Sequence, residues 1–221
     1  MGLGAVILCG GESRRMGRPK AWLDFGPERL LQRLVRQVGD VAEDVAVVAS
    51  PGQDLPPLPA SVIVARDAVP GRGPLQGLAA GLAALPDRVD LAYATSTDVP
   101  FLQAGWIRRL AELIGGHDLA IPRCEGYHHP LAALYRRATA LPAIEALLRE
   151  DRRRLLDLMD AIPTRVVSED ELRPVDPRLG TIRNLNTPED YLAALAAAGF
   201  DAAGPPPTAA VDPGTTGGPA D

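Results

Sequence analysis

The chain has 221 residues, 46% of them apolar and 23% charged, which is typical of a globular protein with a sizeable core. Its formal net charge of −5 and its pI near 5.3 argue against a nucleic-acid-binding protein with a broad basic face. Cys9 and Cys124 form no CxxC or Cys/His zinc motif, no signal peptide opens the sequence, and no window reaches transmembrane length. We therefore expect a cytoplasmic protein that binds neither nucleic acid nor membrane.

Short β-branched runs alternate along the chain with longer segments in which Leu and Ala recur at helical spacing. This alternation is typical of an α/β fold in which βα units surround a mainly parallel sheet. The expected strands are 5–9, 44–49, 61–65, 91–95, 118–122 and 130–135. The expected helices are 27–39, 75–85, 103–114, 138–159 with a break, and 188–198, and Pro-rich 51–59 is expected to be a loop.

The end of the chain differs in composition from the rest. Segment 201–221 is rich in Pro, Gly and Ala, and Val211 is its only large apolar residue. Such a segment buries too little surface to offset the entropy lost on ordering. We expect one domain over residues 1–200 and a disordered tail over 201–221.

The first predicted strand runs into a glycine pair and a basic loop, LCGGESRRMGRPKAW at 8–22. Loops at the carboxyl ends of such strands bind ligands in open α/β sheets. Gly10 and Gly11 allow backbone N–H groups to approach phosphate oxygens, although a glycine pair also serves simply to turn the chain. Lys20 is the one lysine among 23 lysine and arginine residues. Its compact charge favours a triphosphate ligand, and the spacing excludes the GxxxxGK[ST] and GxGxxG motifs.

A second basic cluster, Arg152 to Arg154, alternates with the acids Asp151 and Asp157. This pattern favours a solvated helix face over a binding site.

The segment LCGGESRRMGRPKAWLDFG (8–26) resembles the signature LAGGxSxRMGxDKxLxxxxG of the molybdenum cofactor guanylyltransferases. The resemblance continues through GRGPLQGLAAGL, STDVPFL, HHPLAALY and NLNTPEDY and covers residues 4–198. It implies a Rossmann-like nucleotidyltransferase fold with a mixed, mostly parallel sheet. It also implies transfer of GMP from GTP to molybdopterin or its molybdenum-loaded form, with release of pyrophosphate, and a molybdoenzyme or chaperone as a further partner.

By this resemblance the loop holds the triphosphate, and Asp98 after a buried strand binds Mg²⁺, for which a hard carboxylate is suited. The rival interpretation of Asp98 is a turn or helix cap. Arg15, Lys20 and Asp98 would be the catalytic residues. The phosphate-side residues would be Leu8, Gly10, Gly11, Ser13, Arg15, Gly17 and Lys20.

Two positions depart from the family pattern. Ser96 stands where cysteine is frequent, and we expect this change to leave the proposed chemistry untouched. Pro19 replaces the usual aspartate before Lys20, which removes a carboxylate from the loop and stiffens the approach to the lysine.

The resemblance further assigns nucleoside binding to Asp67, Gly73, Pro74 and Leu75, together with Asp98, and pterin binding to His129, Asn184 and Asn186. A plain strand-to-loop turn is the rival interpretation of Asp67, and capping or loop satisfaction that of the two asparagines. His128 and His129 precede the expected strand 130–135, and because adjacent residues of a strand point to opposite faces, we expect no joint zinc site. Two functional alternatives stay open: a cytidylyl or other nucleotidyl transfer to a phosphorylated small molecule, and a non-catalytic protein that delivers cofactor.

Overall fold

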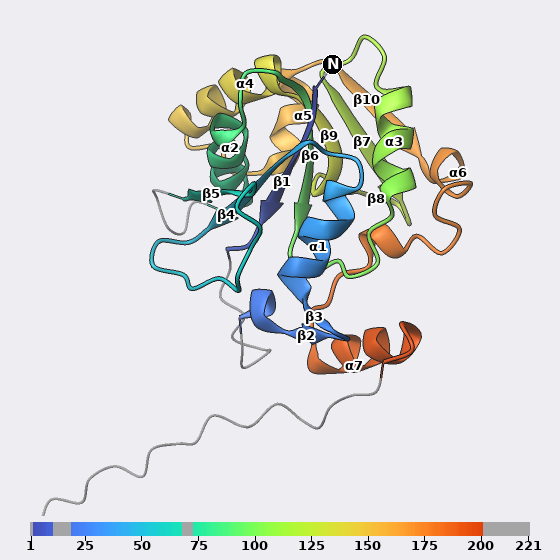
Figure 1. The fold of residues 1–221 in the computed structure, drawn as a ribbon. Helices are drawn as coiled ribbons and strands as arrows, with labels where there is room; N and C mark the ends of the chain where they lie inside the picture. Colours follow the sequence, from blue (N-terminus) through green and yellow to red (C-terminus); the bar gives the residue numbers. More distant parts are fainter. Residues whose placement is uncertain (1, 11–18, 68–72, 201–221) are drawn as a thin grey trace, which may run out of the picture.

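The structure is a computed structural model that describes residues 2–10, 19–67 and 73–200. Helices cover both faces of one central sheet (Figure 1), which confirms the predicted three-layer α/β fold. The predicted tail 201–221 lies outside the described residues, so the expected division of the chain stays a prediction.

One mixed sheet forms the middle layer. Its strands are β1 (Gly2–Leu8), β4 (Asp44–Ala49), β5 (Ile63–Arg66), β6 (Val89–Ser96), β7 (Leu119–Cys124), β8 (Tyr127–His128), β9 (Ala132–Arg136) and β10 (Thr164–Ser168). They run in the order β10-β7-β9-β6-β1-β4-β5, with β8 paired to β7. β9 is antiparallel to β6 and β7, and β8 is antiparallel to β7, whereas the other pairs are parallel. The carboxyl ends of β1, β4, β5, β6 and β7 therefore share one edge, at which β9 begins.

Helices α1 (Leu30–Gly39), α3 (Ala104–Leu113) and α6 (Glu169–Leu172) pack on one face of this sheet. Helices α2 (Pro74–Ala84), α4 (Arg137–Arg149) and α5 (Leu158–Ala161) pack on the other. Strand β1 is buried on both sides: Ala5 and Ile7 belong to the first hydrophobic cluster, Val6 and Leu8 to the second. This two-sided burial explains its continuous apolar sequence.

Helix α2 lies very close to β1. A Cβ at Gly81 would be 2.2 Å from Cγ1 of Val6, and a Cβ at Gly77 would be 3.3 Å from Cδ2 of Leu8. Only glycine permits this approach at Gly81. The contact with Leu8 places the start of α2 at the carboxyl edge of the sheet.

A third cluster joins distant parts of the chain below that edge (Figure 1). The hairpin of β2 (Asp24–Phe25) and β3 (Glu28–Arg29) packs against α7 (Pro188–Ala197). The ring of Phe25 contacts Phe101 and Phe200 edge-on, with centroids 5.9 and 5.7 Å apart. This cluster brings the segment after Lys20 next to the start of α7.

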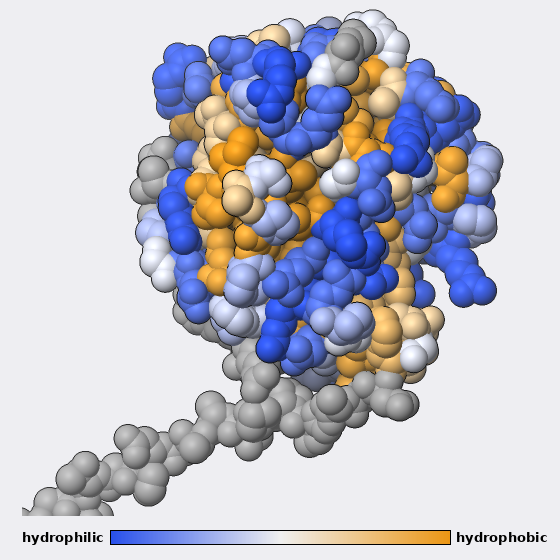
Figure 2. All heavy atoms as spheres, viewed as in Figure 1, coloured by the Kyte–Doolittle hydropathy of each residue, from blue (hydrophilic) through white to orange (hydrophobic). Residues whose placement is uncertain are grey.

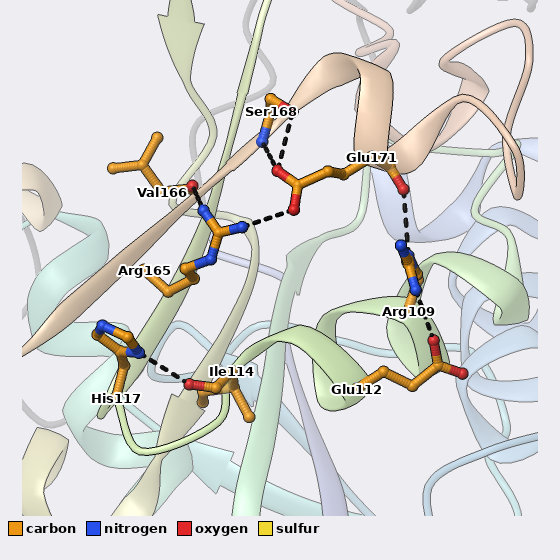
Figure 3. A network of polar contacts seen from close by, with 8 residues as sticks. All are labelled: Arg109, Glu112, Ile114, His117, Arg165, Val166, Ser168 and Glu171. Atoms are coloured by element: carbon orange, nitrogen blue, oxygen red, sulfur yellow. Dashed lines mark hydrogen bonds and ion pairs between the residues drawn. The ribbon is translucent and has the colours of Figure 1, made fainter.

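The sequence prediction missed β10 and α6, which one polar network joins (Figure 3). Ser168 is the N-cap of α6 in a capping box, in which its backbone N–H donates to the Glu171 carboxylate; its hydroxyl donates to the same carboxylate oxygen. Arg165 of β10 donates to the other oxygen of Glu171, and Arg109 of α3 donates to the Glu171 carbonyl. These contacts fasten α3 to the edge strand.

The other predicted elements are found with ends within about three residues of those expected, and 51–59 is free of helix and strand as predicted. The expected break in 138–159 is confirmed: α4 ends at Arg149 and Asp151 has a positive φ of 59°. The chain resumes in a 3₁₀ turn (Leu155–Asp157) and α5. Arg152 to Arg154 are exposed, but the interpretation of this segment as a helix face was wrong because it lies between helices.

Cys9 and Cys124 are both buried free thiols. In the part of the chain that the structure describes, no helix has the length and apolarity needed to cross a membrane.

Candidate active site

The candidate site is built where β1 and β6 end side by side. Leu8, the last residue of β1, pairs with Ser96, the last residue of β6. The backbone N–H and the hydroxyl of buried Thr97 both donate to the Leu8 carbonyl, over 3.1 and 3.0 Å. The turn that carries Asp98 is thereby fastened to the end of the central strand.

Each oxygen of the Asp98 carboxylate has its own partner. Nζ of Lys20 lies 2.9 Å from Oδ2, and Oγ of Ser96 donates to Oδ1 over 2.5 Å. The side chains of Lys20 and Asp98 are 22% and 15% exposed, so the pair is sheltered but reachable from solvent. The hydroxyl of Ser96 thus contacts the proposed metal ligand, a contact that the sequence analysis did not predict.

Lys20 begins a one-turn 3₁₀ helix, Lys20–Trp22. Pro19 precedes it with φ of −58° and accepts a hydrogen bond from the N–H of Trp22, while Leu23 donates to the Lys20 carbonyl. The proline ring favours this φ, so the residue that departs from the family signature also fixes the backbone that carries Lys20.

Residues 184–186, near the end of the described chain, lie beside the turn that carries Asp98. The backbone N–H of Leu185 donates to the Asp98 carbonyl over 2.8 Å. Asn184 and Asn186 flank Leu185 and are both exposed. The structure thus brings the two proposed pterin-binding asparagines next to Asp98.

Asp190 holds this segment and was missed by sequence reasoning. Its Oδ2 accepts from the N–H groups of Asn186 and Thr187, each over 2.9 Å, while the Thr187 hydroxyl accepts from the N–H of Asp190. These hydrogen bonds hold the pKa of Asp190 below its usual range, and the charge of Lys20 adds to the effect. Thr187, not Asn186, is therefore the N-cap of α7.

The start of α2 supplies exposed backbone at the same edge. Gly73 has φ of 80° and ψ of −178°, a conformation that favours glycine, and Pro74 occupies the first turn. The side chain of Leu75 is fully buried, as that of Leu8 nearly is. Leu75 can therefore offer a ligand only its backbone. Arg153 lies beside this turn, since its carbonyl is 3.9 Å from where a Cβ of Gly73 would be.

Gly10 and Asp67 lie at the same edge. Gly10 is exposed and lies beside Ser50. A Cβ at Gly10 would be 3.1 Å from Oγ of Ser50. Asp67 follows β5, and its N–H donates to the Ala49 carbonyl over 3.0 Å. This placement fits both the nucleoside contact and the turn. Four further predicted phosphate-side residues lie outside the described residues: Gly11, Ser13, Arg15 and Gly17.

The two histidines precede β9, as expected, and only His128 lies in a strand. His128 ends β8, opposite Arg123 of β7, and His129 occupies the turn before β9. Nε2 of His129 is 3.3 Å from the Cys124 carbonyl. The antiparallel direction of β9 places His129 at the carboxyl edge. No group of three or more His, Cys, Asp or Glu side chains suited to a metal ion occurs within the described ranges.

The sequence of the chain matches a known family. The family model described as "MobA-like NTP transferase domain" matches residues 5–172. The Mycobacterium tuberculosis protein named "Probable molybdenum cofactor guanylyltransferase" is 39% identical over 164 residues, which cover 72% of this chain and 80% of the relative. The protein of the same name from Pelotomaculum thermopropionicum is 33% identical over 189 residues, 86% of this chain and 90% of the relative.

Solved structures show the same fold. Molybdopterin-guanine dinucleotide biosynthesis protein A from Archaeoglobus fulgidus superposes with a TM-score of 0.72 at 20% identity, covering 89% of this chain and 98% of the other. The 2-C-methyl-D-erythritol 4-phosphate cytidylyltransferase from Thermus thermophilus gives 0.65 at 20% identity, covering 90% and 100%. The sequence relatives and the family model make the assignment: the chain is a nucleotidyltransferase of the MobA-like NTP transferase family, and within it belongs to the molybdenum cofactor guanylyltransferases.

Proposed function

We propose that this chain transfers GMP from GTP to the phosphate of molybdopterin or of the molybdenum cofactor, with Mg²⁺ as the metal. A phosphate oxygen of the pterin attacks the α-phosphorus, the bond to the β-phosphate oxygen breaks, and pyrophosphate leaves in line. The phosphate nucleophile is largely ionised near neutral pH, so positioning and charge neutralisation dominate. The observation that carries the proposal is the meeting of Lys20 and Asp98, 78 residues apart, at the carboxyl edge of the sheet.

The residues present fit a divalent cation. Asp98 offers a hard carboxylate oxygen, and this oxygen already faces the positive charge of Lys20. When bound, the metal supplies neutralisation of charge on the α-phosphate and the departing pyrophosphate. Lys20 and Arg15 would add positive charge at the triphosphate, and backbone N–H groups of the glycine-rich loop would donate to its oxygens.

We assign the two substrates to the two sides of Asp98. The turn Gly73 to Leu75 and the carboxylate of Asp67 would border the nucleoside. On the other side, Asn184 and Asn186 flank Leu185, whose N–H donates to the Asp98 carbonyl; their amides, with His129, would contact the pterin. A molybdoenzyme or chaperone would receive the product. Buried free thiols at Cys9 and Cys124 suit work in the reducing cytoplasm.

The proposal is tested by thermal unfolding with GTP, CTP, ATP and UTP, each with and without Mg²⁺, followed by a molybdopterin-dependent pyrophosphate assay. A ligand that binds the native state raises its melting temperature. We expect the largest, Mg²⁺-enhanced shift with GTP and pyrophosphate release only when pterin is present. A preference for CTP would assign the cytidylyl reaction, and binding without pyrophosphate release would assign a delivery role.

A further inference from the structure

The two carboxylate oxygens of Asp98 contact side chains that differ in conformational freedom. Oδ1 accepts from the hydroxyl of Ser96, the last residue of the central strand β6. The next residue, Thr97, is fixed by its two hydrogen bonds to the Leu8 carbonyl. Oδ2 faces Lys20, whose ammonium sits on a flexible four-carbon chain. The Ser96 contact is thus short and anchored, whereas the Lys20 contact can be exchanged.

Resting on the proposed function, we propose that Ser96 is a positioning residue that reserves Oδ2 of Asp98 for a cation. In the ligand-free chain Lys20 occupies that oxygen. When a nucleotide binds, its phosphates draw Lys20 away while Ser96 keeps the carboxylate in place, and Oδ2 becomes available to the divalent metal.

Repulsion between the ammonium of Lys20 and a divalent metal ion requires this exchange. Two cations a few ångströms apart repel strongly in a sheltered site, so Lys20 must turn away from Oδ2 when a divalent ion approaches it. Nucleotide phosphates offer the ammonium several negatively charged oxygens in compensation. The free protein should therefore bind the metal weakly, and the protein with nucleotide should bind it tightly.

The test is direct binding of Mn²⁺, a spectroscopic substitute for Mg²⁺, followed by the electron paramagnetic resonance signal of the free ion. The proteins are wild type, Lys20→Met, Ser96→Ala, Ser96→Thr, Asp98→Asn and Ser61→Ala, the last being an exposed serine outside the site. Without nucleotide, Lys20→Met should bind Mn²⁺ more tightly than wild type by at least about tenfold, because a nearby positive charge is removed.

Ser96→Ala should weaken Mn²⁺ binding by about 10- to 100-fold in the presence of GTP, as expected when a ligand loses its orienting partner. Ser96→Thr keeps the hydroxyl and should bind like wild type. In turnover, Ser96→Ala should need more Mg²⁺ for half-maximal rate but approach the wild-type rate at saturation. A merely structural defect would lower the rate at every Mg²⁺ concentration and lower the melting temperature.

The inference is overturned if Lys20→Met leaves Mn²⁺ affinity unchanged, or if Ser96→Ala matches Ser61→Ala. Ser96→Thr gives a further test that does not require Ser96→Ala to fold. Because this variant keeps the hydroxyl, a large loss of its Mn²⁺ affinity would also contradict the inference. Asp98→Asn distinguishes failure of this inference from failure of the proposed metal role of Asp98. If it abolishes Mn²⁺ binding while Ser96→Ala has no effect, only the inference fails; if it too has no effect, the proposed metal role of Asp98 fails as well.

Discussion

The backbone N–H of Leu185 donates to the carbonyl of Asp98 over 2.8 Å, which joins the last part of the domain to the turn after its central strand β6. Lys20 contacts the side chain of the same aspartate. Three segments far apart in sequence therefore meet at one residue, Leu185 through the backbone of Asp98 and Lys20 through its carboxylate.

Asp98→Asn should abolish metal-dependent turnover with little change in fold. The amide keeps the shape and can still accept from Ser96, but it loses the charge that attracts a cation. Loss of several kcal/mol of transition-state stabilisation corresponds to at least about a hundredfold lower rate. Pyrophosphate release and the melting temperature measure the two effects. Asp160→Asn, an exposed aspartate on α5, is the control, and near-normal activity of Asp98→Asn would contradict the assignment.

Gly73→Ala should disturb the start of α2. The φ of 80° and ψ of −178° lie in a region that only glycine adopts readily, so alanine should lower the free energy of unfolding by about 1–3 kcal/mol. GTP affinity should fall as well, because the turn proposed to border the nucleoside must shift. Denaturant unfolding and nucleotide titration measure both.

Gly39→Ala is the matched control for this change. Gly39 ends α1 without a positive φ, and no heavy atom lies within 4 Å of an added Cβ. Its substitution should leave GTP affinity unchanged. Equal effects of the two variants would contradict a special role for the turn at Gly73.

Asp190→Asn should loosen the segment that carries Asn184 and Asn186. The folded pKa of Asp190 is depressed, so its carboxylate stabilises the native state above the unfolded pKa, and this contribution is lost as pH falls through the folded pKa. The variant should thus be less stable than wild type at neutral pH, and the difference should shrink below about pH 4, the ordinary range of an aspartate. Thermal unfolding across pH measures this.

The same variant should raise the KM for molybdopterin more than the KM for GTP. Asp170→Asn in the first turn of α6 is the control, because its carboxylate has no hydrogen bond or ion pair to the described residues. A stability difference that is constant with pH would show that the charge of Asp190 does not act through these hydrogen bonds.

The sequence predicted the layers well because the central strands are buried on both sides and read as continuous apolar runs. It missed β10 because only Val167 of this edge strand is fully buried, while Arg165 and Ser168 serve the polar network around Glu171. A half-buried edge strand with charged residues gives no clear period.

The structure brings together Lys20 and Asp98, two candidate site residues that the sequence had singled out by their residue type and position. The contact between Ser96 and Asp98 was not predicted, because sequence does not tell whether a hydroxyl two residues from a carboxylate points toward it. In the sequence, Asp190 looks like an ordinary residue in the first turn of a helix. Only the hydrogen bond of Leu185 to Asp98 shows that the segment held by Asp190 borders the candidate site.

The most direct measurement follows the fate of the nucleotide phosphates. The purified chain is incubated with molybdopterin, Mg²⁺ and GTP radiolabelled in either its α- or its γ-phosphate, and the pterin product is separated. We predict that label from the α-phosphate, and none from the γ-phosphate, appears in the pterin product, with one pyrophosphate released per product. Label from the γ-phosphate on the pterin, or no pterin product from GTP at all, would contradict guanylyl transfer by this chain.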